Sequence, residues 1–254
     1  MKKFIIPAIA LFVMSADVCL GQSLQQRAAA AKAAANSALN GNSKSGAKTP
    51  LSNDEVVKGL RDALTVGTNN STAFASKVDG FYKTPKLFIP FPPKAADVKN
   101  KLDEIGMKPQ TDQFVMTLNR AAEEAAKNAA PVFLDAIKGM SIGDGFTILK
   151  GADNAATQYL QNKTTAELTQ KFTPIVQAAI NKVEVTKYWN PLITTYNKLP
   201  FVEKQNPDLT AYVTERAMAG LFLLIAEEEL KIRKDPVAQV TDILKKVFGS
   251  ITGK

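Results

Sequence analysis

The chain has 254 residues, 32 basic and 24 acidic side chains, one cysteine and no histidine. The missing histidine excludes Ser-His and Cys-His nucleophile pairs, imidazole bases and histidine-bound zinc, so any catalysis must use carboxylates, hydroxyls, lysine or tyrosine. The formal net charge of +8 is spread along the chain, which most often means only solubility; in an exported protein it favours anionic envelope surfaces over nucleic acid as a partner.

The N-terminal 21 residues have the pattern of a secretory signal peptide: two lysines, an apolar run over 4–14, and small residues ending at Gly21. The run is shorter than the roughly 20 residues of a membrane-spanning helix. We expect cleavage after Gly21 and export to the periplasm or beyond. Lipidation at Cys19 is the alternative, but Asp17 just before it does not suit a lipoprotein signal.

The next segment, residues 22–50, consists mainly of Ala, Asn, Ser, Gly and Lys. It has too few large apolar side chains to offset the entropy lost on ordering, so we interpret it as a low-complexity, disordered tether. From residue 51 to 249 the composition suits one domain of ordinary size. Residues 250–254 are expected to form a short C-terminal tail.

The domain shows helical periodicity, and no run alternates as paired strands would. Ser52 is a suitable N-cap for a first helix, which we expect Gly67 to end. Further helices are expected over 95–105, 112–139, 142–149, 152–160, 165–183, 187–198, 209–234 and 237–248. The predicted fold is therefore all-α, a single globular multi-helix domain.

A proline-rich stretch interrupts the helices between residues 85 and 93. Its four prolines exclude a helix, so residues 87–91 should run extended. Three aromatic side chains of the surrounding segment, Phe81, Phe88 and Phe91, would form a binding lip if they lie outside. The more common alternative is that they pack onto the core.

The predicted helix over 112–139 carries one continuous apolar face, spaced at three and four residues. This face comprises Phe114, Leu118, Ala122, Ala125, Ala129, Phe133, Ala136 and Met140. Pro131 should introduce a kink. Arg120 lies nearly opposite the face and could pair with Glu123 or Glu124 one turn on. Alternatively, Arg120 and Glu123 share an interior site with a carboxylate from another helix.

A second charged cluster follows the apolar run 221–226. Glu227 with Lys231, and Glu229 with Arg233, are four residues apart and form favourable helix pairs. Glu228 instead falls on the apolar face, where a carboxylate must find a cation, hydrogen-bond donors or a proton. We name Arg120 and Arg233 as its candidate partners, in either a structural ion pair or a functional site.

A resemblance to a known family rests on several words in order along the chain. They are VDGF, NRAAEEA, DAIKGMS, ILKG, AATQYL, DLTAYV, GLFLLIAEEELKIRKDP and VFG. This set resembles the bacterial family called domain of unknown function 4197, over about residues 51–249. The resemblance implies a helical exported or envelope-associated protein and supplies no activity. Gly145 stands where the family would lead us to expect Ala, which questions the regularity of that short helix.

The main functional hypothesis is a non-enzymatic binding or structural protein of the cell envelope, without metal or cofactor. Its partner would be an envelope lipid, a glycan or a protein, and the candidate binding residues are Arg120, Arg233, Phe81, Phe88 and Phe91. The alternative is a carboxylate-dependent enzyme acting on cell-wall glycan, with Glu228 or Glu123 as the acid.

Overall fold

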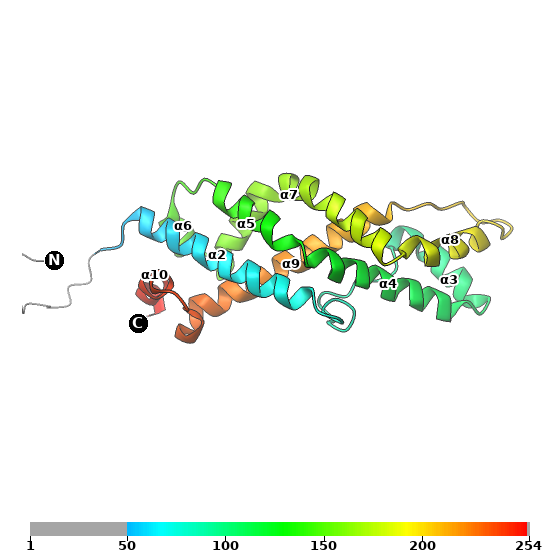
Figure 1. Cartoon of the computed structure of the whole chain (residues 1–254), viewed down its shortest axis with the longest axis horizontal. Coiled ribbons are helices and arrows are strands. Elements are labelled where there is room, and N and C mark those ends of the chain that lie inside the picture. The colour runs from blue at the N-terminus through cyan, green and yellow to red at the C-terminus, as the bar shows by residue number, and fades with distance from the viewer. Residues whose placement is uncertain (1–49, 253–254) are drawn as a thin grey trace, which may run out of the picture. The chain divides into compact units, whose positions relative to one another are not determined.

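A computed structural model describes residues 50–252, and the predicted signal peptide, Cys19 and the tether lie outside this range. The residues from Leu51 onward form one compact unit. This part of the chain contains helices and no strand, which confirms the all-α prediction (Figure 1). The α-helices are α2 (Asn53–Ala75), α3 (Ala96–Glu104), α4 (Lys108–Ala126), α5 (Ala129–Gly139), α6 (Gly145–Leu149), α7 (Ala155–Lys182), α8 (Val185–Tyr196), α9 (Leu209–Lys234) and α10 (Asp242–Thr252).

Helix α2 begins where the sequence predicts but ends later. Ser52 and Glu55 form a reciprocal capping box, in which each side chain accepts from the other's backbone N–H. Gly67 does not end the helix, which continues to Ala75. Gly67 is buried at the contact with α9, where an added Cβ would meet Cβ of Glu228 at 3.4 Å, an ordinary contact distance. The expected stop at Gly67 was wrong because a single glycine costs a helix only about 1 kcal/mol and does not by itself end a helix that packs against a neighbour.

The apolar stretch predicted as one kinked helix is divided into α4 and α5. Helix α4 ends at Ala126, and the N–H of Asn128 turns to the carbonyl of Ala125. Pro131 cannot donate to the carbonyl of Lys127, so the chain breaks just before the proline instead of bending at it. The predicted apolar face is nevertheless continuous, because all eight of its members are buried.

Two other predicted boundaries also differ from the structure. The helices expected over 152–160 and 165–183 are one helix, α7. Toward the C-terminus, a 3-10 turn at Pro236–Ala238 precedes α10, which starts at Asp242 and continues past the expected tail boundary to Thr252. Residues 87–91 are non-helical, as the prolines predict.

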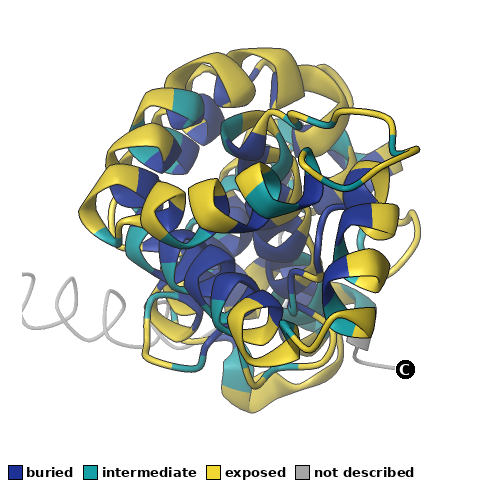
Figure 2. Ribbon diagram, turned by 90° about the vertical axis from the view of Figure 1, so that its right-hand side faces the viewer, coloured by how far each residue is buried: buried dark blue, intermediate teal, exposed yellow. Residues whose placement is uncertain are grey.

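Helix α9 occupies the centre of the bundle and packs against α2 and α7 (Figure 1). The end-on view shows buried residues on the inner sides of the helices and exposed residues around the outside (Figure 2). Among the described helices, α9 is long and apolar enough to cross a membrane, with a mean hydropathy of 1.4. Its central position accounts for much of this apolarity, and 56% of its apolar window is buried.

Candidate functional site

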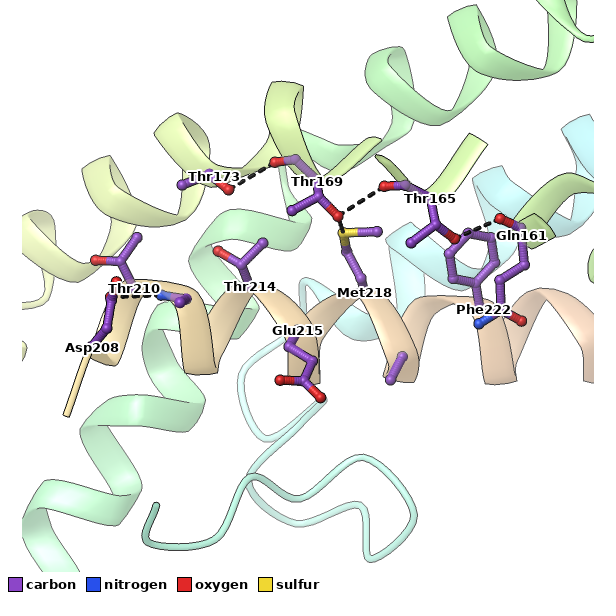
Figure 3. A pocket seen from close by; sticks show the side chains of 12 residues that line it. Gln161, Thr165, Thr169, Thr173, Asp208, Thr210, Thr214, Glu215, Met218 and Phe222 are labelled. Atoms are coloured by element: carbon purple, nitrogen blue, oxygen red, sulfur yellow. Dashed lines mark hydrogen bonds between the residues drawn. The ribbon is translucent and has the colours of Figure 1, made fainter. Parts of the chain in front are cut away.

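An open groove of about 460 Å³ lies between α7 and α9 (Figure 3). Most of the surface that lines the groove is apolar. Helix α9 supplies Met218 and Phe222, and α7 supplies a row of threonines. The lining residues are Gln161, Thr165, Thr169, Thr173, Asp208, Thr210, Ala211, Thr214, Glu215, Met218, Ala219 and Phe222. A groove of this size and character is within the range of ligand sites in proteins.

The threonines on the α7 side present little free polarity. The hydroxyls of Thr169 and Thr173 donate to the backbone carbonyls four residues earlier, at 2.8 and 2.7 Å. Such back-bonding satisfies the hydroxyl within its own helix. Thr169 also lies 3.6 Å from the sulfur of Met218 on α9. The row seen along α7 in Figure 3 therefore has its hydroxyls committed to its own backbone.

Thr214 on α9 differs from the α7 threonines. Its side chain is 2% exposed, lines the groove, and its hydroxyl has no hydrogen-bond partner within residues 50–252. A buried hydroxyl without a partner costs about 1–3 kcal/mol. Thr214 is thus a polar group inside an apolar groove that a ligand could satisfy.

The charges along the groove are all negative. Asp208 and Glu215 belong to the lining, and no basic side chain does. Asp208 caps α9 by accepting from the N–H of Ala211 at 2.9 Å. In the described part of the chain, neither carboxylate takes part in an ion pair, and Glu215 extends from α9 at the border of the groove that lies opposite α7 (Figure 3).

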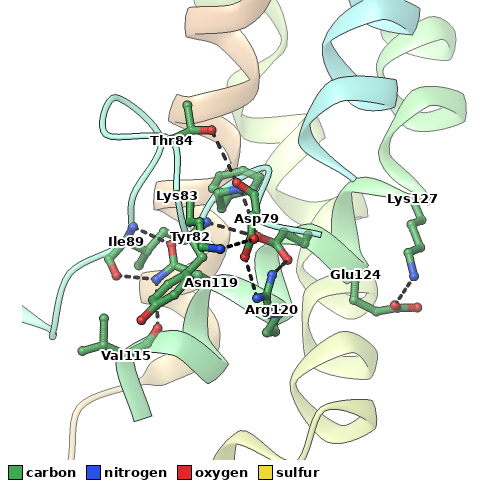
Figure 4. Close-up of polar contacts among 12 residues, drawn as sticks. Asp79, Tyr82, Lys83, Thr84, Ile89, Val115, Asn119, Arg120, Glu124 and Lys127 are labelled. Carbon is green, nitrogen blue, oxygen red and sulfur yellow. Dashed lines mark hydrogen bonds and ion pairs between the residues drawn. The ribbon is translucent and has the colours of Figure 1, made fainter. Parts of the chain in front are cut away.

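A separate polar network holds the loop after α2 against α4 (Figure 4). Glu123 is buried and accepts from the backbone N–H groups of Phe81 and Tyr82, both at 3.1 Å. Arg120 donates to Glu123 at 2.6 Å and to Asp79 at 2.7 Å. Asp79 adopts a left-handed backbone conformation with φ of 68°. Arg120 and Glu123 thus share an interior with a carboxylate from a loop, where sequence reasoning offered one from another helix.

Asn119 completes this network, and sequence reasoning missed it. Its side chain is fully buried, accepts from the N–H of Ile89 and donates to the carbonyl of Ile89, both at 2.8 Å. The Asn119 amide therefore makes the two hydrogen bonds to Ile89 that the backbone of a neighbouring strand would make. Asn119 lies between Leu118 and Arg120 in the sequence, so only its position next to the charged Arg120–Glu123 pair could have drawn attention to it.

The most deeply buried acidic side chain of α9 is Glu229, not Glu228. Glu229 is 1% exposed and accepts from the N–H groups of Ala156 and Thr157 at 3.0 and 2.7 Å. Arg233 pairs with Glu229 at 2.7 Å and donates to the carbonyls of Ile148 and Leu149. The predicted Glu229–Arg233 pair exists, and it joins α9 to the ends of α6 and α7.

Glu228 occupies a different environment from the one predicted. It lies at the edge of the α2–α9 contact, where Asn70 donates to it at 2.7 Å and Lys231 pairs with it. Neither Arg120 nor Arg233 reaches it, which corrects the predicted partners. Glu227 pairs with Lys86 instead of Lys231. The helical wheel placed Glu228 on the apolar face, but the rim of that face is where α2 supplies polar groups.

The three aromatic residues of the proline-rich region do not form an exposed lip. Phe81 is fully buried against Gly220, where an added Cβ would lie 3.0 Å from the ring. Phe91 is also buried, with its ring 5.1 Å from that of Phe114. Phe88 is half-buried, 6.1 Å from the ring of Tyr82. The core alternative therefore describes Phe81 and Phe91.

The two predicted catalytic carboxylates do not come together in one cleft. Glu123 belongs to the loop network, where its carboxylate accepts from two backbone N–H groups and from Arg120, donors that hold the loop against α4. Glu228 lines a small cavity of about 150 Å³ between α2 and α9. Across residues 50–252, no group of three or more acidic side chains could hold a metal ion.

Comparison with known proteins identifies one family. The family described as protein of unknown function DUF4197 matches residues 50–249. No curated protein and no solved structure gives a match. Gly145, questioned on the basis of the family pattern, begins α6, where an added Cβ would lie 3.0 Å from Val56 of α2. Because the family match covers the helical domain almost from end to end, the chain belongs to the DUF4197 family.

Proposed function

We propose that this protein is a non-enzymatic binding protein of the bacterial cell envelope, and that its ligand places an apolar surface in the α7–α9 groove. The observation that carries the proposal is Thr214, an unpartnered and buried hydroxyl within an apolar groove of about 460 Å³. An apolar groove with a few polar groups is the usual form of a ligand site.

The hydrogen bonds made by the buried carboxylates support a binding function over a catalytic one. Glu123 and Glu229 each accept two or more hydrogen bonds from backbone N–H groups or an arginine. A general acid needs a proton and access to the leaving group. Both side chains are instead committed to holding loops and helix ends, so neither supplies the acid of a glycan-cleaving site.

The location in the envelope rests on the N-terminal sequence and the charge. The signal-like segment ending at Gly21 directs export, and the positive charge suits the anionic surfaces of a bacterial envelope. Exposure of the chain to an added protease in intact and in osmotically shocked cells tests this location. Protection before shock and cleavage after it places the protein in the periplasm, whereas cleavage only after full lysis contradicts export.

The groove itself is tested by the methyl resonance of Met218 in the purified protein. Decanol, a small apolar probe, should shift this resonance and leave that of Met107, in the turn before α4, unchanged. Thr169→Trp fills the groove and should abolish the shift. Thr194→Trp, which places the same side chain on the exposed face of α8, should retain it. If decanol leaves Met218 unchanged, or shifts it equally in Thr169→Trp, the groove is not the binding site.

A further inference from the structure

We propose that the occupant of the α7–α9 groove is a helix of a partner protein with an apolar face bordered by lysine or arginine. This inference rests on the proposed binding function and names the chemistry of the partner. Three features of the described domain carry it: the length and form of the groove, the uncovered apolar surface of α9, and the sign of the charges at the rim.

The groove has the form that accepts a helix lengthwise. Its α7 wall extends from Gln161 to Thr173, twelve residues along the chain, which at about 1.5 Å per residue is roughly 18 Å, or three helical turns. Two packed helices present such a furrow to a third helix, with interaxial distances of about 8–10 Å. Amphipathic helices bind grooves of this kind through side chains spaced three and four residues apart.

The side chains in the groove permit a close approach. Ala211 and Ala219 stand on the α9 side, and the threonine row on the α7 side is small. Small residues at a helix contact let the facing backbone come near. Thr214 supplies one buried hydroxyl that a polar side chain on the incoming helix could meet. A helix with small apolar residues and one hydrogen-bonding group therefore fits this lining.

Part of the apolar surface of α9 is left uncovered within the described domain. Its apolar window is 56% buried, although its mean hydropathy reaches that of a membrane-spanning helix. Leu223, one turn beyond Ala219, is 41% exposed. The uncovered apolar surface thus continues along α9 past the groove. A third helix lying on α9 would remove this surface from water, which favours the complex.

The charges select the type of partner. The groove is lined by Asp208 and Glu215 and by no basic side chain, and neither carboxylate is in an ion pair within residues 50–252. Fatty acids and anionic lipid headgroups would meet like charge at this rim. A helix with basic residues beside its apolar face would meet opposite charge, which raises the association rate and excludes acidic competitors. Charge complementarity therefore favours a basic helix over an anionic amphiphile.

The test uses three 14-residue helical peptides that share one Leu/Ala face and differ at the flanking positions, which are all Lys, all Gln or all Glu. Binding is measured through the Met218 methyl resonance and by titration calorimetry. The Lys peptide should bind at least about tenfold more tightly than the Glu peptide, with the Gln peptide between them. Added salt should reduce the differences in affinity among the three peptides, because salt screens the charges at the rim of the groove.

Two variants of the full chain locate the charge effect. Glu215→Gln should weaken the Lys peptide about two- to fivefold, the range of one exposed ion pair, and leave the Gln peptide unchanged. Glu203→Gln removes an exposed carboxylate outside the groove and serves as the matched control. Asp208 is left in place because it caps α9.

The outcomes separate this inference from the proposed function. If decanol shifts Met218 but none of the peptides does, or if the Glu peptide binds as well as the Lys peptide, the basic helix is wrong while the apolar groove stands. If decanol and all peptides fail, both fall. A native mass of two chains, lost in Thr169→Trp, would instead assign the groove to a second copy of this protein and overturn the inference.

Discussion

At the scale of single residues, neighbouring glutamates on α9 have different environments that sequence spacing alone could not rank. Glu228 and Glu229 both have a basic residue three or four positions away. Glu229 is buried because the start of α7 directs two backbone N–H groups and the hydroxyl of Thr157 at it. The donors that decide which carboxylate is buried therefore lie more than seventy residues away along the chain.

Replacement of Glu123 tests the loop network. Glu123→Ala leaves the N–H groups of Phe81 and Tyr82 without their acceptor and Arg120 paired only with Asp79. Arg120 is partly exposed and keeps Asp79, so the main cost comes from the backbone N–H groups left without an acceptor. A buried donor without a partner costs about 1–3 kcal/mol, and we expect the free energy of unfolding in urea to fall by about that amount.

Glu167 provides the matched control for this measurement. Its side chain is half exposed and pairs with Lys171 within one helix. Exposed pairs of this kind contribute about 0.2–1 kcal/mol, so Glu167→Ala should change the free energy of unfolding by less than about 1 kcal/mol. Equal losses in the two variants would show that the Glu123 network does not hold the loop.

At the scale of elements, helix boundaries follow tertiary contacts wherever local signals are ambiguous. Gly67 looks like a stop signal but lies inside α2 at the contact with α9. The threonines of α7 lower helix propensity, yet their hydroxyls bond to the preceding turn and the helix continues. Strong signals, such as the Ser52 cap and the prolines after residue 84, agree with the structure.

Gly59 on α2 offers a test of element packing. A Cβ at this position would lie 2.7 Å from Cγ2 and 2.9 Å from Cβ of Val247 on α10, so the buried valine or its helix must move. We expect Gly59→Ala to lower the free energy of unfolding by about 1–3 kcal/mol, as overpacking does. Val247→Ala added to this variant should restore part of the loss.

Gly139, at the end of α5, is the control for Gly59. An added Cβ would meet nothing within 4 Å there, and the backbone does not require glycine. Gly139→Ala should be neutral or stabilise by about 0.4–1 kcal/mol through the unfolded chain. Hydrogen exchange should show faster exchange of α10 in Gly59→Ala only. Unchanged α10 protection in both variants would contradict the close contact between α2 and α10.

At the scale of the whole molecule, the loss of folding stability at low pH, which we call the acidic limb, should come from protonation of carboxyl groups that are paired in the folded protein. A hydrogen bond from Lys246 lowers the pKa of Glu55 from 4.5 to about 2, and Lys83 followed by Arg120 lowers the pKa of Asp79. Hydrogen bonds from Lys127 and Lys182 lower the pKa of Glu124. Because the unfolded chain binds these protons more readily, this stability is present above about pH 5 and is lost as the pH falls toward 2.

Folding stability should also fall at high pH. Burial raises the pKa of Tyr212, and hydrogen bonds to Asp112 and Glu167 raise the pKa values of Lys108 and Lys171. These contributions are present below about pH 10 and are lost as the pH rises further. Since no histidine is present, the free energy of unfolding should be nearly flat from about pH 5 to 9. Urea denaturation across pH measures this profile, and a step between pH 5 and 8 would contradict it.

Glu55→Gln gives the control for the acidic limb. The variant removes the carboxyl group that ties α2 to Lys246 of α10, so stability should fall less steeply below pH 4 than in the parent chain. An identical acid profile in the variant would mean that Glu55 does not contribute to the limb.

The sequence by itself determined the helical class, most helix positions and the family, because hydrophobic periodicity, caps and prolines act over a few residues. The long face of α4 and α5, and the full span of α9, could be read in this way. Tertiary structure alone decided that Glu229 is buried, that Asn119 clamps Ile89, and that threonines of α7 line a groove with Met218. Each of these depends on which helices meet, and no local pattern encodes which distant segment supplies the partner.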